Sequence, residues 1–303
     1  MLESKMEQLK IFNDLLEELE GKLIVLHDKS EENAQNTLQA LWHAAFGNKV
    51  SPIIAETLEL PVLQLSQISI LEEYIKNRLS GVPLAHLTER QHFLGLDFIL
   101  KKGLYIPRKE TELLAKTAIN CIKEEFDENV KIIDLCTGIG TVALAIAHYC
   151  KNTTVYGSDI FEPAINAAKI NMKHFCLEER ASFYHADLFD PFEFLSLKSN
   201  TNIIVSAPPY ISSAKVKQMA TEISNHEPAE AFDAGPYGLS IFSKLISIAP
   251  QYLCNNGYLI FECGLGQGEF LANRISKNKY SGDITKICDE RGNVRVIKVK
   301  KIS

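Results

Sequence analysis

The chain has 303 residues, of which 46% are hydrophobic and 23% are charged, and its formal net charge is −6. This composition excludes a disordered chain and is typical of a globular protein long enough for two domains. The acidic total disfavours avid binding to DNA or RNA, which depends on basic residues, so we expect no stable nucleic-acid binding. The seven cysteines contain no C-x-x-C pair, which excludes a zinc ribbon and a disulfide framework. The charged N-terminus and the lack of an apolar stretch of about 18 residues predict a cytoplasmic protein without a membrane span.

Apolar residues recur at helical spacing in three early segments of the chain, residues 6–19, 34–46 and 68–79. Pro52 and Pro61 separate these segments, since proline suits the start of a helix better than its interior. This part of the chain carries neither a glycine-rich phosphate loop nor metal-ligand spacing. We interpret it as a helical bundle that serves recognition or packing rather than chemistry.

Residues 86–107 predict a β-hairpin that links two domains. Apolar and aromatic residues stand on both sides of Lys101-Lys102-Gly103, where the glycine suits a turn. The predicted organisation is therefore a helical substrate-recognition domain over residues 1–85, the linking hairpin, and a second domain over residues 108–303.

Strands alternate with helices through the second domain. The expected strands are residues 130–135, 153–157, 181–185, 202–205, 258–262, 284–288 and 294–299. The expected helices are residues 141–150, 163–175, 237–253 and 267–275. Such alternation predicts an α/β fold, with a mostly parallel sheet covered by helices on both faces.

The first candidate motif is a glycine turn that follows the strand at residues 130–135. It comprises Asp134, Cys136, Thr137, Gly138, Ile139 and Gly140. Glycines at a strand-to-helix junction let the backbone approach a ligand closely, and the next helix directs its N-terminus at that ligand. The dinucleotide pattern G-x-G-x-x-G is absent, so an acid beside spaced glycines favours a ligand with a positively charged amino group. The alternative is an ordinary turn between strand and helix.

Two further acids follow the next two expected strands. Asp159 stands where a carboxylate accepts the ribose hydroxyls of an adenosine, although a helix N-cap is the competing interpretation. Asp187 or its backbone suits the amine and ring nitrogens of adenine, and Leu188 or Phe189 suits the face of the ring. A surface acid is the alternative for Asp187.

The fourth motif is the loop Ser206-Ala207-Pro208-Pro209-Tyr210 at the end of an expected strand. Two prolines remove two N–H donors and stiffen the backbone, which leaves carbonyl oxygens for the crevice beyond the strand ends. The loop therefore favours a clamp for a substrate nitrogen with Tyr210 as an aromatic wall. A rigid loop without function is the alternative.

These four motifs, in this order, resemble a class I S-adenosylmethionine-dependent methyltransferase, and the P-P-Y loop resembles those that act on nitrogen. Further segments resemble the protein N5-glutamine methyltransferases of peptide chain release factors, the PrmC/HemK family. They are G-V-P at 81–83, F-L-G at 93–95, I-P-R-K-E-T-E at 106–112, H-E-P at 226–228, A-G-P-Y-G-L at 234–239 and E-C-G-L-G-Q at 262–267. The similarity covers essentially the whole chain.

The resemblance implies a Rossmann-like domain of seven strands with the last antiparallel, and S-adenosylmethionine as cofactor. The cofactor-binding residues that it implies are Asp134, Cys136, Thr137, Gly138, Ile139, Gly140, Asp159, Asp187, Leu188 and Ala207. The catalytic loop that it implies is Ala207, Pro208, Pro209 and Tyr210. The acceptor would be the side-chain amide of the glutamine in the G-G-Q motif of a release factor, which the helical domain would hold.

Four positions depart from the family pattern. Ala207 replaces the asparagine of N-P-P-Y, Cys136 replaces a glycine, Lys109 replaces a proline, and Pro236-Tyr237 replace an acidic pair. The loss of the asparagine keeps open a diverged N-methyltransferase that acts on a metabolite or another protein, with Ser206 as a possible substitute for the lost amide. A non-catalytic binding protein and a nucleic-acid adenine methyltransferase are the remaining alternatives.

Overall fold

The computed structural model describes residues 2–26, 29–277, 280 and 282–302. It divides into two compact units, which we call the helical unit and the sheet unit. The helical unit comprises Met1–Ile106 together with Ala220–Glu227, and the sheet unit comprises Pro107–Met219 and Pro228–Ser303. The sequence did not predict that residues 220–227 fold with the helical unit. No helix among the described residues is long and apolar enough to span a membrane.

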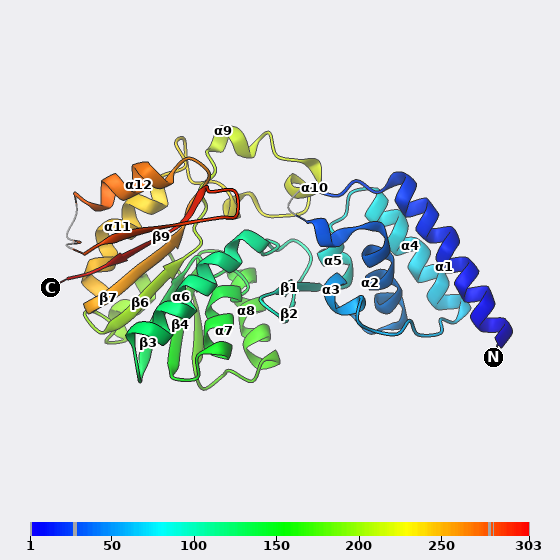
Figure 1. The fold of residues 1–303 in the computed structure, drawn as a ribbon, viewed down its shortest axis with the longest axis horizontal. Coiled ribbons are helices and arrows are strands. Elements are labelled where there is room, and N and C mark those ends of the chain that lie inside the picture. Colours follow the sequence, from blue (N-terminus) through cyan, green and yellow to red (C-terminus); the bar gives the residue numbers. More distant parts are fainter. Residues whose placement is uncertain (1, 27–28, 278–279, 281, 303) are drawn as a thin grey trace. The chain divides into compact units, whose positions relative to one another are not determined.

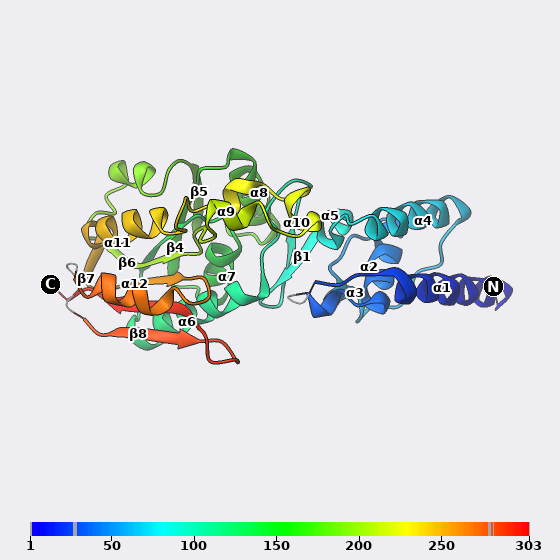
Figure 2. The same ribbon diagram turned by 90° about the horizontal axis from the view of Figure 1, so that it is seen from above.

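The three predicted helices of the helical unit are all present. They are α1 (Leu2–Lys22), α2 (Ala34–Phe46) and α4 (Leu65–Leu79), joined by the short η1 (Ser30–Glu32), α3 (Pro52–Ala55) and α5 (Leu84–Thr88). Helix α2 is central, because α1, α3, α4 and α5 all pack against it (Figure 2). Its Trp42 is buried and donates its indole N–H to the carbonyl of Pro61 at 2.8 Å. A core of this size lets the helical unit form a packed body of its own.

The predicted hairpin exists, but its turn lies elsewhere. Strands β1 (Arg90–Phe93) and β2 (Leu96–Ile99) are antiparallel and belong to the helical unit. They are joined by Leu94 and Gly95, whose φ angles are +51° and +79°. A two-residue hairpin needs positive φ at both positions, which glycine adopts readily and leucine rarely does. The expected turn at residues 101–103 was therefore wrong, because the true turn contains a leucine that gives no turn signal.

The sheet unit contains the expected α/β fold. Its strands are β3 (Val130–Leu135), β4 (Thr153–Asp159), β5 (Ala181–His185), β6 (Thr201–Ser206), β7 (Leu253–Glu262), β8 (Ile284–Cys288) and β9 (Val294–Lys300). They form one sheet in the order β5-β4-β3-β6-β7-β9-β8 (Figure 1). β9 alone runs antiparallel to its neighbours β7 and β8, whereas the pairs from β5 to β7 are parallel. The seven strands and the antiparallel last strand are as predicted.

Helices cover both faces of this sheet (Figure 1). The main helices are α6 (Glu112–Glu125), α7 (Thr141–Tyr149), α8 (Glu162–His174), α11 (Ser240–Tyr252) and α12 (Gly268–Ile275). The sequence analysis missed α6, although its apolar residues follow a helical period. The remaining short helices are η2 (Lys109–Thr111), η3 (Asp190–Phe194), α9 (Ser213–Val216), α10 (Thr221–Ser224) and η4 (Ala229–Ala231), and of these α10 belongs to the helical unit.

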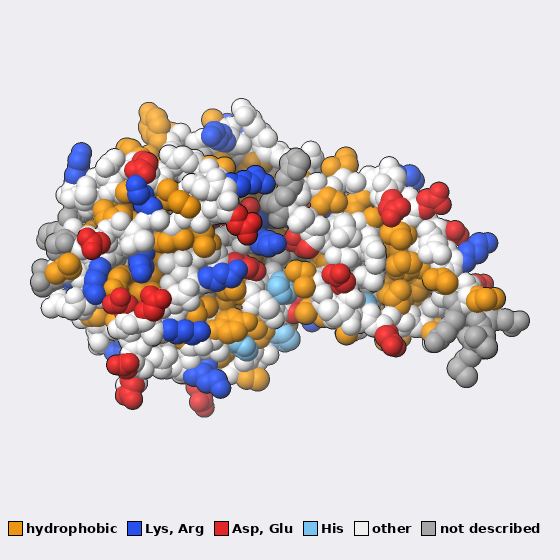
Figure 3. Space-filling view, in the orientation of Figure 1, with side chains coloured by type: hydrophobic (Ala, Val, Ile, Leu, Met, Phe, Trp, Pro, Cys, Tyr) orange, Lys and Arg blue, Asp and Glu red, His pale blue; other side chains and the backbone are white. Residues whose placement is uncertain are grey.

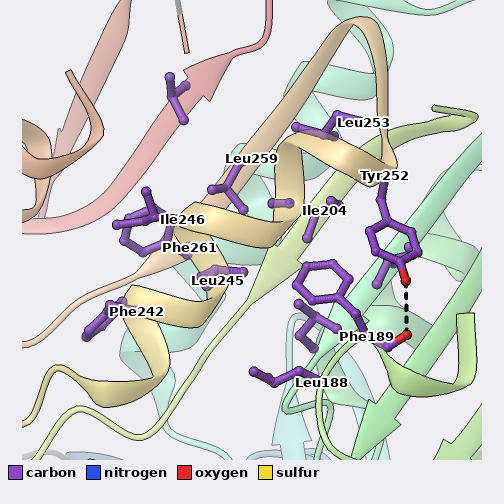
Figure 4. Close-up of a cluster of buried hydrophobic side chains, with 14 of the residues drawn as sticks. Leu188, Phe189, Ile204, Phe242, Leu245, Ile246, Tyr252, Leu253, Leu259 and Phe261 are labelled. Carbon is purple, nitrogen blue, oxygen red and sulfur yellow. Dashed lines mark hydrogen bonds between the residues drawn. The ribbon is translucent and has the colours of Figure 1, made fainter. Parts of the chain in front are cut away.

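A buried cluster beneath α11 supports the loop that follows β5 (Figure 4). The ring of Phe189 stacks on that of Tyr252 with centroids 4.8 Å apart, and the Tyr252 hydroxyl donates to the Phe189 carbonyl at 3.4 Å. Stacked aromatic pairs of this kind stabilise a core beyond the area they bury. Phe189 is therefore part of the core, and Leu188 is the remaining candidate for contact with adenine.

Candidate active site

The register of the sheet brings the predicted motifs to one edge. Leu135 of β3 pairs with Ser158 of β4 on one side and with Ser206 of β6 on the other. The glycine turn, Asp159 and Ala207 therefore follow three neighbouring strands at the same level. Open α/β sheets bind ligands beyond the carboxyl ends of their strands, which is where these residues lie.

Asp134 holds the glycine turn together from the inside. Its side chain is buried, and Oδ2 accepts hydrogen bonds from the Thr137 hydroxyl at 2.6 Å and from the Ala143 amide at 3.2 Å. Burial raises the pKa of this carboxyl to about 7. Asp134 thus fixes the turn and the first residues of α7.

The two glycines of the turn have different surroundings. Gly138 has φ +56°, and a Cβ at this position would meet no atom within 4 Å. Gly140 has φ +85°, and its Cβ would lie 3.0 Å from the side chains of Leu144 and Phe183. Gly138 therefore leaves open space for a ligand beside the backbone, whereas Gly140 lets the helix pack closely on the sheet.

Cys136 occupies the position where the family pattern has a glycine. Its φ is +58°, a conformation that costs a non-glycine residue about 1 kcal/mol or more. Burial raises the pKa of its thiol well above the ordinary value, so the sulfur is protonated at neutral pH. This supports the role of a packed cysteine and not that of a nucleophile.

Asp159 connects β4 to the glycine turn. Its Oδ2 accepts the Gly138 amide at 2.8 Å, and its Oδ1 accepts the Phe161 amide at 2.9 Å. The N-cap of α8 is Phe161, so the competing N-cap interpretation of Asp159 is wrong. A carboxylate accepts hydrogen bonds from hydroxyl groups, so the contact of Asp159 with a cofactor ribose stays a prediction.

In the segment predicted to contact adenine, Asp187 is about half exposed and Leu188 is buried. Asp187 forms an ion pair with Lys244 at 2.7 Å, with both side chains about half exposed. Leu188 is buried, has φ +45°, and its carbonyl accepts the Ser158 hydroxyl at 2.6 Å. The structure thus fixes the backbone at residue 188, while the Asp187 side chain faces solvent and contacts a lysine.

The acceptor loop, which we define as residues 207–210, directly follows Ser206, the last residue of β6. The buried Ser206 hydroxyl donates to the Leu135 carbonyl at 2.9 Å, so its only proton is already used and it has no donor left to replace that of the missing asparagine amide. No donor in the described part of the chain forms a hydrogen bond to the carbonyl oxygens of Ala207 or Pro208. The two carbonyl oxygens thus keep their hydrogen-bonding capacity at the end of β6.

Gln267 holds the acceptor loop by its backbone. Its Nε2 donates to the Tyr210 carbonyl at 3.1 Å and to the Gly238 carbonyl at 3.3 Å, and its Oε1 accepts the Gly264 amide at 2.9 Å. Gly238 and Gly264 must lack a side chain for Tyr210 to lie this close to them. A Cβ at Gly238 would lie 2.6 Å from the Tyr210 carbonyl oxygen, and a Cβ at Gly264 would lie 2.9 Å from the Tyr210 ring.

The Tyr210 hydroxyl is held separately. It donates to Oε1 of the buried Glu262 at 3.2 Å, and Arg295 lies 3.4 Å from the hydroxyl and 3.5 Å from the same carboxylate oxygen. Burial is the largest cause that raises the pKa values of Tyr210 and Glu262. Sequence reasoning quoted Glu262 and Gln267 without a role and missed Arg295, which is a nearly buried charge in the last strand. Tyr210 is therefore fixed at its carbonyl, ring and hydroxyl.

No cluster of three or more metal-binding side chains occurs among the described residues. The geometry is that of a cofactor turn beside a rigid loop with two available carbonyl acceptors.

The sequence of this chain is similar to those of known methyltransferases. The family model described as "Methyltransferase small domain" matches residues 109–235. A release factor glutamine methyltransferase of Clostridium acetobutylicum is 33% identical over 208 residues, which cover 69% of this chain and 72% of that protein. One from Bradyrhizobium diazoefficiens is 29% identical over 276 residues, which cover 89% of both. The crystal structure of the release-factor-specific protein-(glutamine-N5) methyltransferase from Alicyclobacillus acidocaldarius is 22% identical, with a TM-score of 0.39, and the match covers 65% of this chain and 95% of that one.

Proposed function

The chain belongs to the release factor glutamine methyltransferase family, and we propose that its acceptor is a glutamine side-chain amide of a peptide chain release factor. The chain is a methyltransferase, and its methyl donor is S-adenosylmethionine. The proposal concerns the acceptor, for which the G-G-Q glutamine is the candidate. The cytoplasm, where release factors act, is the proposed compartment.

The observation that carries the proposal is the pair of available carbonyl oxygens at Ala207 and Pro208. A primary amide presents two N–H donors, and carbonyl acceptors at the end of β6 orient its nitrogen toward the cofactor turn. The sulfonium of the cofactor, when bound, supplies a methyl group that is already activated for transfer. Alignment of donor and acceptor therefore provides much of the rate.

The carbonyl groups of the acceptor loop would also stabilise the transition state electrostatically. An amide nitrogen is a poor nucleophile, and positive charge grows on it as the new bond forms. The Ala207 and Pro208 carbonyls would stabilise that charge through the N–H groups, because fixed dipoles lower the energy of a transition state without reorganising. The rigid mounting of Tyr210 by Gln267 and Glu262 keeps these carbonyls in place.

The helical unit is the proposed binding site for the release factor. Apolar side chains gather on the face of this unit that Figure 3 displays. Its exposed apolar residues include Met6 at 70%, Leu9 at 60% and Leu65 at 85% exposure. Exposed apolar surface of this kind favours contact with another protein.

The test of the acceptor is direct. Full-length release factor is incubated with the protein and isotope-labelled S-adenosylmethionine, and the peptide with the G-G-Q motif is analysed by mass spectrometry. We expect one methyl group on the glutamine amide. An unmethylated glutamine at saturating donor would contradict the proposal.

One observation favours a second acceptor class. Ala207 lacks the family's amide side chain, and the Ser206 hydroxyl is engaged with Leu135. The space left by the missing side chain suits a different nitrogen substrate, such as an amine of a metabolite or of another protein. Label transfer from the cofactor into a component of cell extract other than the release factor would support this class.

A further inference from the structure

Four buried charged side chains form a closed ring in the helical unit. Arg78 contacts Glu32 at 3.0 Å and Glu222 at 3.2 Å. Lys29 contacts the same two carboxylates, at 3.7 Å and 3.2 Å. None of the four side chains is more than 11% exposed. We call this set the charge ring.

Glu222 comes from a distant part of the sequence. It lies 193 residues from Lys29 and 144 residues from Arg78, in α10 of the inserted segment 220–227. The same segment has a second attachment, because Glu227 accepts the backbone amide of Ile106 at 2.8 Å. Residues 220–227 are thus fastened to the helical unit at both ends.

The inserted segment is the tip of a long excursion from the acceptor loop. The excursion begins at Ile211, directly after Tyr210, and it ends at Gly235. Its two arms pair at the base: Ile211 exchanges hydrogen bonds with Phe232 and Ala234, at 3.0 and 2.9 Å. Ser213 adds bonds to Gly235 and Asp233, at 3.1 and 2.7 Å.

The paired base continues directly into the residues that fix Tyr210. Gly238 follows the second arm by three positions, and its carbonyl shares the Gln267 side chain with the Tyr210 carbonyl. The chain that leads from the charge ring back to the acceptor loop is therefore held by hydrogen bonds at its base.

We propose that Glu222 is a positioning residue for the methyl acceptor: the charge ring fixes the tip of the excursion 211–235, and the paired base passes that restraint to Tyr210. The proposal rests on the proposed function for its activity readout. In this arrangement the charge ring acts on the acceptor loop through the covalent chain of residues 211–222. The cofactor turn, which lies on other strands, does not depend on it.

The charge ring stabilises the position of the inserted segment because its charges are buried. A buried charge that loses its partners is strongly destabilising, whereas the intact ring pairs each carboxylate with two cations. Replacing Glu222 by glutamine keeps the shape and the oxygen acceptor but leaves Lys29 and Arg78 with one carboxylate between them. Helix α10 should then loosen, although Glu227 still accepts the Ile106 amide, and the core of the sheet unit should stay intact.

The test compares Glu222→Gln with Glu230→Gln in the full-length protein. Glu230 is an exposed carboxylate of the same excursion, so the control carries the same chemical change without touching the ring. We expect Glu222→Gln to lower kcat for release-factor methylation about tenfold or more, as a small misplacement of reacting groups does. The dissociation constant of S-adenosylmethionine should not change, and hydrogen exchange of amides 211–235 should accelerate. The control should match the wild type in all three measurements.

Two outcomes would overturn the proposal. One is unchanged exchange at residues 211–235 in Glu222→Gln, and the other is faster exchange with unchanged kcat. If the variant fails to fold, Glu222→Asp, which keeps the charge on a shorter side chain, is measured in its place. If the wild type methylates no release factor, the proposed acceptor is wrong, and hydrogen exchange still decides whether the ring fixes the excursion.

Discussion

The carboxylate of Asp159 accepts the backbone amide of Gly138 at 2.8 Å, which ties the end of one strand to the glycine turn of the neighbouring strand. The space beside Gly138 is open, so the same carboxylate borders the region where a cofactor ribose fits. Asp159 therefore shapes the turn, and the contact with the ribose hydroxyls that the sequence predicts for it is the subject of the first prediction. Burial raises the pKa of this carboxyl, because the charged form is poorly solvated inside the protein. Hydrogen-bond donors beside it therefore stabilise the charged form.

The first prediction concerns cofactor affinity. Asp159→Asn keeps one side-chain oxygen that can accept a hydrogen bond from the turn. It removes the negative charge and replaces the second oxygen by an NH2 group. We expect binding of S-adenosylmethionine to weaken by about 1–3 kcal/mol, because the ribose hydroxyls lose charge-assisted hydrogen bonds. Calorimetric titration measures this, with Glu162→Gln, an exposed carboxylate at the start of α8, as the matched control. Equal affinity in the two variants would remove Asp159 from the cofactor site.

The second prediction concerns the pH dependence of stability. Asp134 has a pKa of about 7 in the folded protein, above the unfolded value of about 3.9. Between these values the folded carboxyl keeps a proton that the unfolded chain releases, so stability falls as pH rises toward 7 and levels off above it. Asp134→Asn cannot titrate but keeps an oxygen for Thr137 and Ala143.

The free energy of unfolding of the wild type should therefore fall between about pH 4 and about pH 7, whereas that of Asp134→Asn should not. The difference between the two proteins should grow in favour of the variant over this range. One pKa unit corresponds to about 1.4 kcal/mol, so the gain should reach a few kcal/mol in cofactor-free protein. Urea unfolding at several pH values measures it. Parallel pH curves for the two proteins would show that the pKa of Asp134 is not raised in the folded protein.

The sequence predicted the sheet well because local patterns determine it. Strand and helix periods in residues 130–299 reflect burial of one face, and they locate β3 and α8 to within two residues. Contacts between distant residues were not predictable in this way. Arg295 reaches Tyr210 across 85 residues, and Glu222 reaches Lys29 across 193, with no local signal at either end. The contacts by which Gln267, Glu262 and Arg295 hold the acceptor loop were therefore found only in the structure.

The third prediction separates backbone strain from steric contact at the acceptor loop. Gly238 and Gly292 both have positive φ, +69° and +81°, so alanine is strained at either position. A Cβ at Gly292 faces open space, whereas one at Gly238 would lie 2.6 Å from the Tyr210 carbonyl oxygen. Both alanine variants should lose about 1 kcal/mol of stability from the backbone.

Only Gly238→Ala should also lower methyl transfer, by about tenfold or more, because it displaces the carbonyl that Gln267 holds. Cofactor affinity should stay the same in both variants. Steady-state kinetics with the acceptor, together with thermal unfolding, measure the two effects separately. Equal activity of the two variants would show that the position of Tyr210 does not limit the reaction.

The fourth prediction returns to Ala207, the departure that bears most on the acceptor. If a release-factor glutamine is the substrate, two backbone carbonyls hold its amide without the family's side chain. Ala207→Asn should then raise the rate, since one well-placed polar contact at a transition state is commonly worth about 3 kcal/mol. If the substrate is another nitrogen compound, the added side chain occupies space that this substrate needs, and the rate on it should fall. Ala207→Val adds bulk without an amide and is the matched control: a release-factor enzyme gains only from asparagine, whereas a site reshaped around a different substrate loses activity with both substitutions.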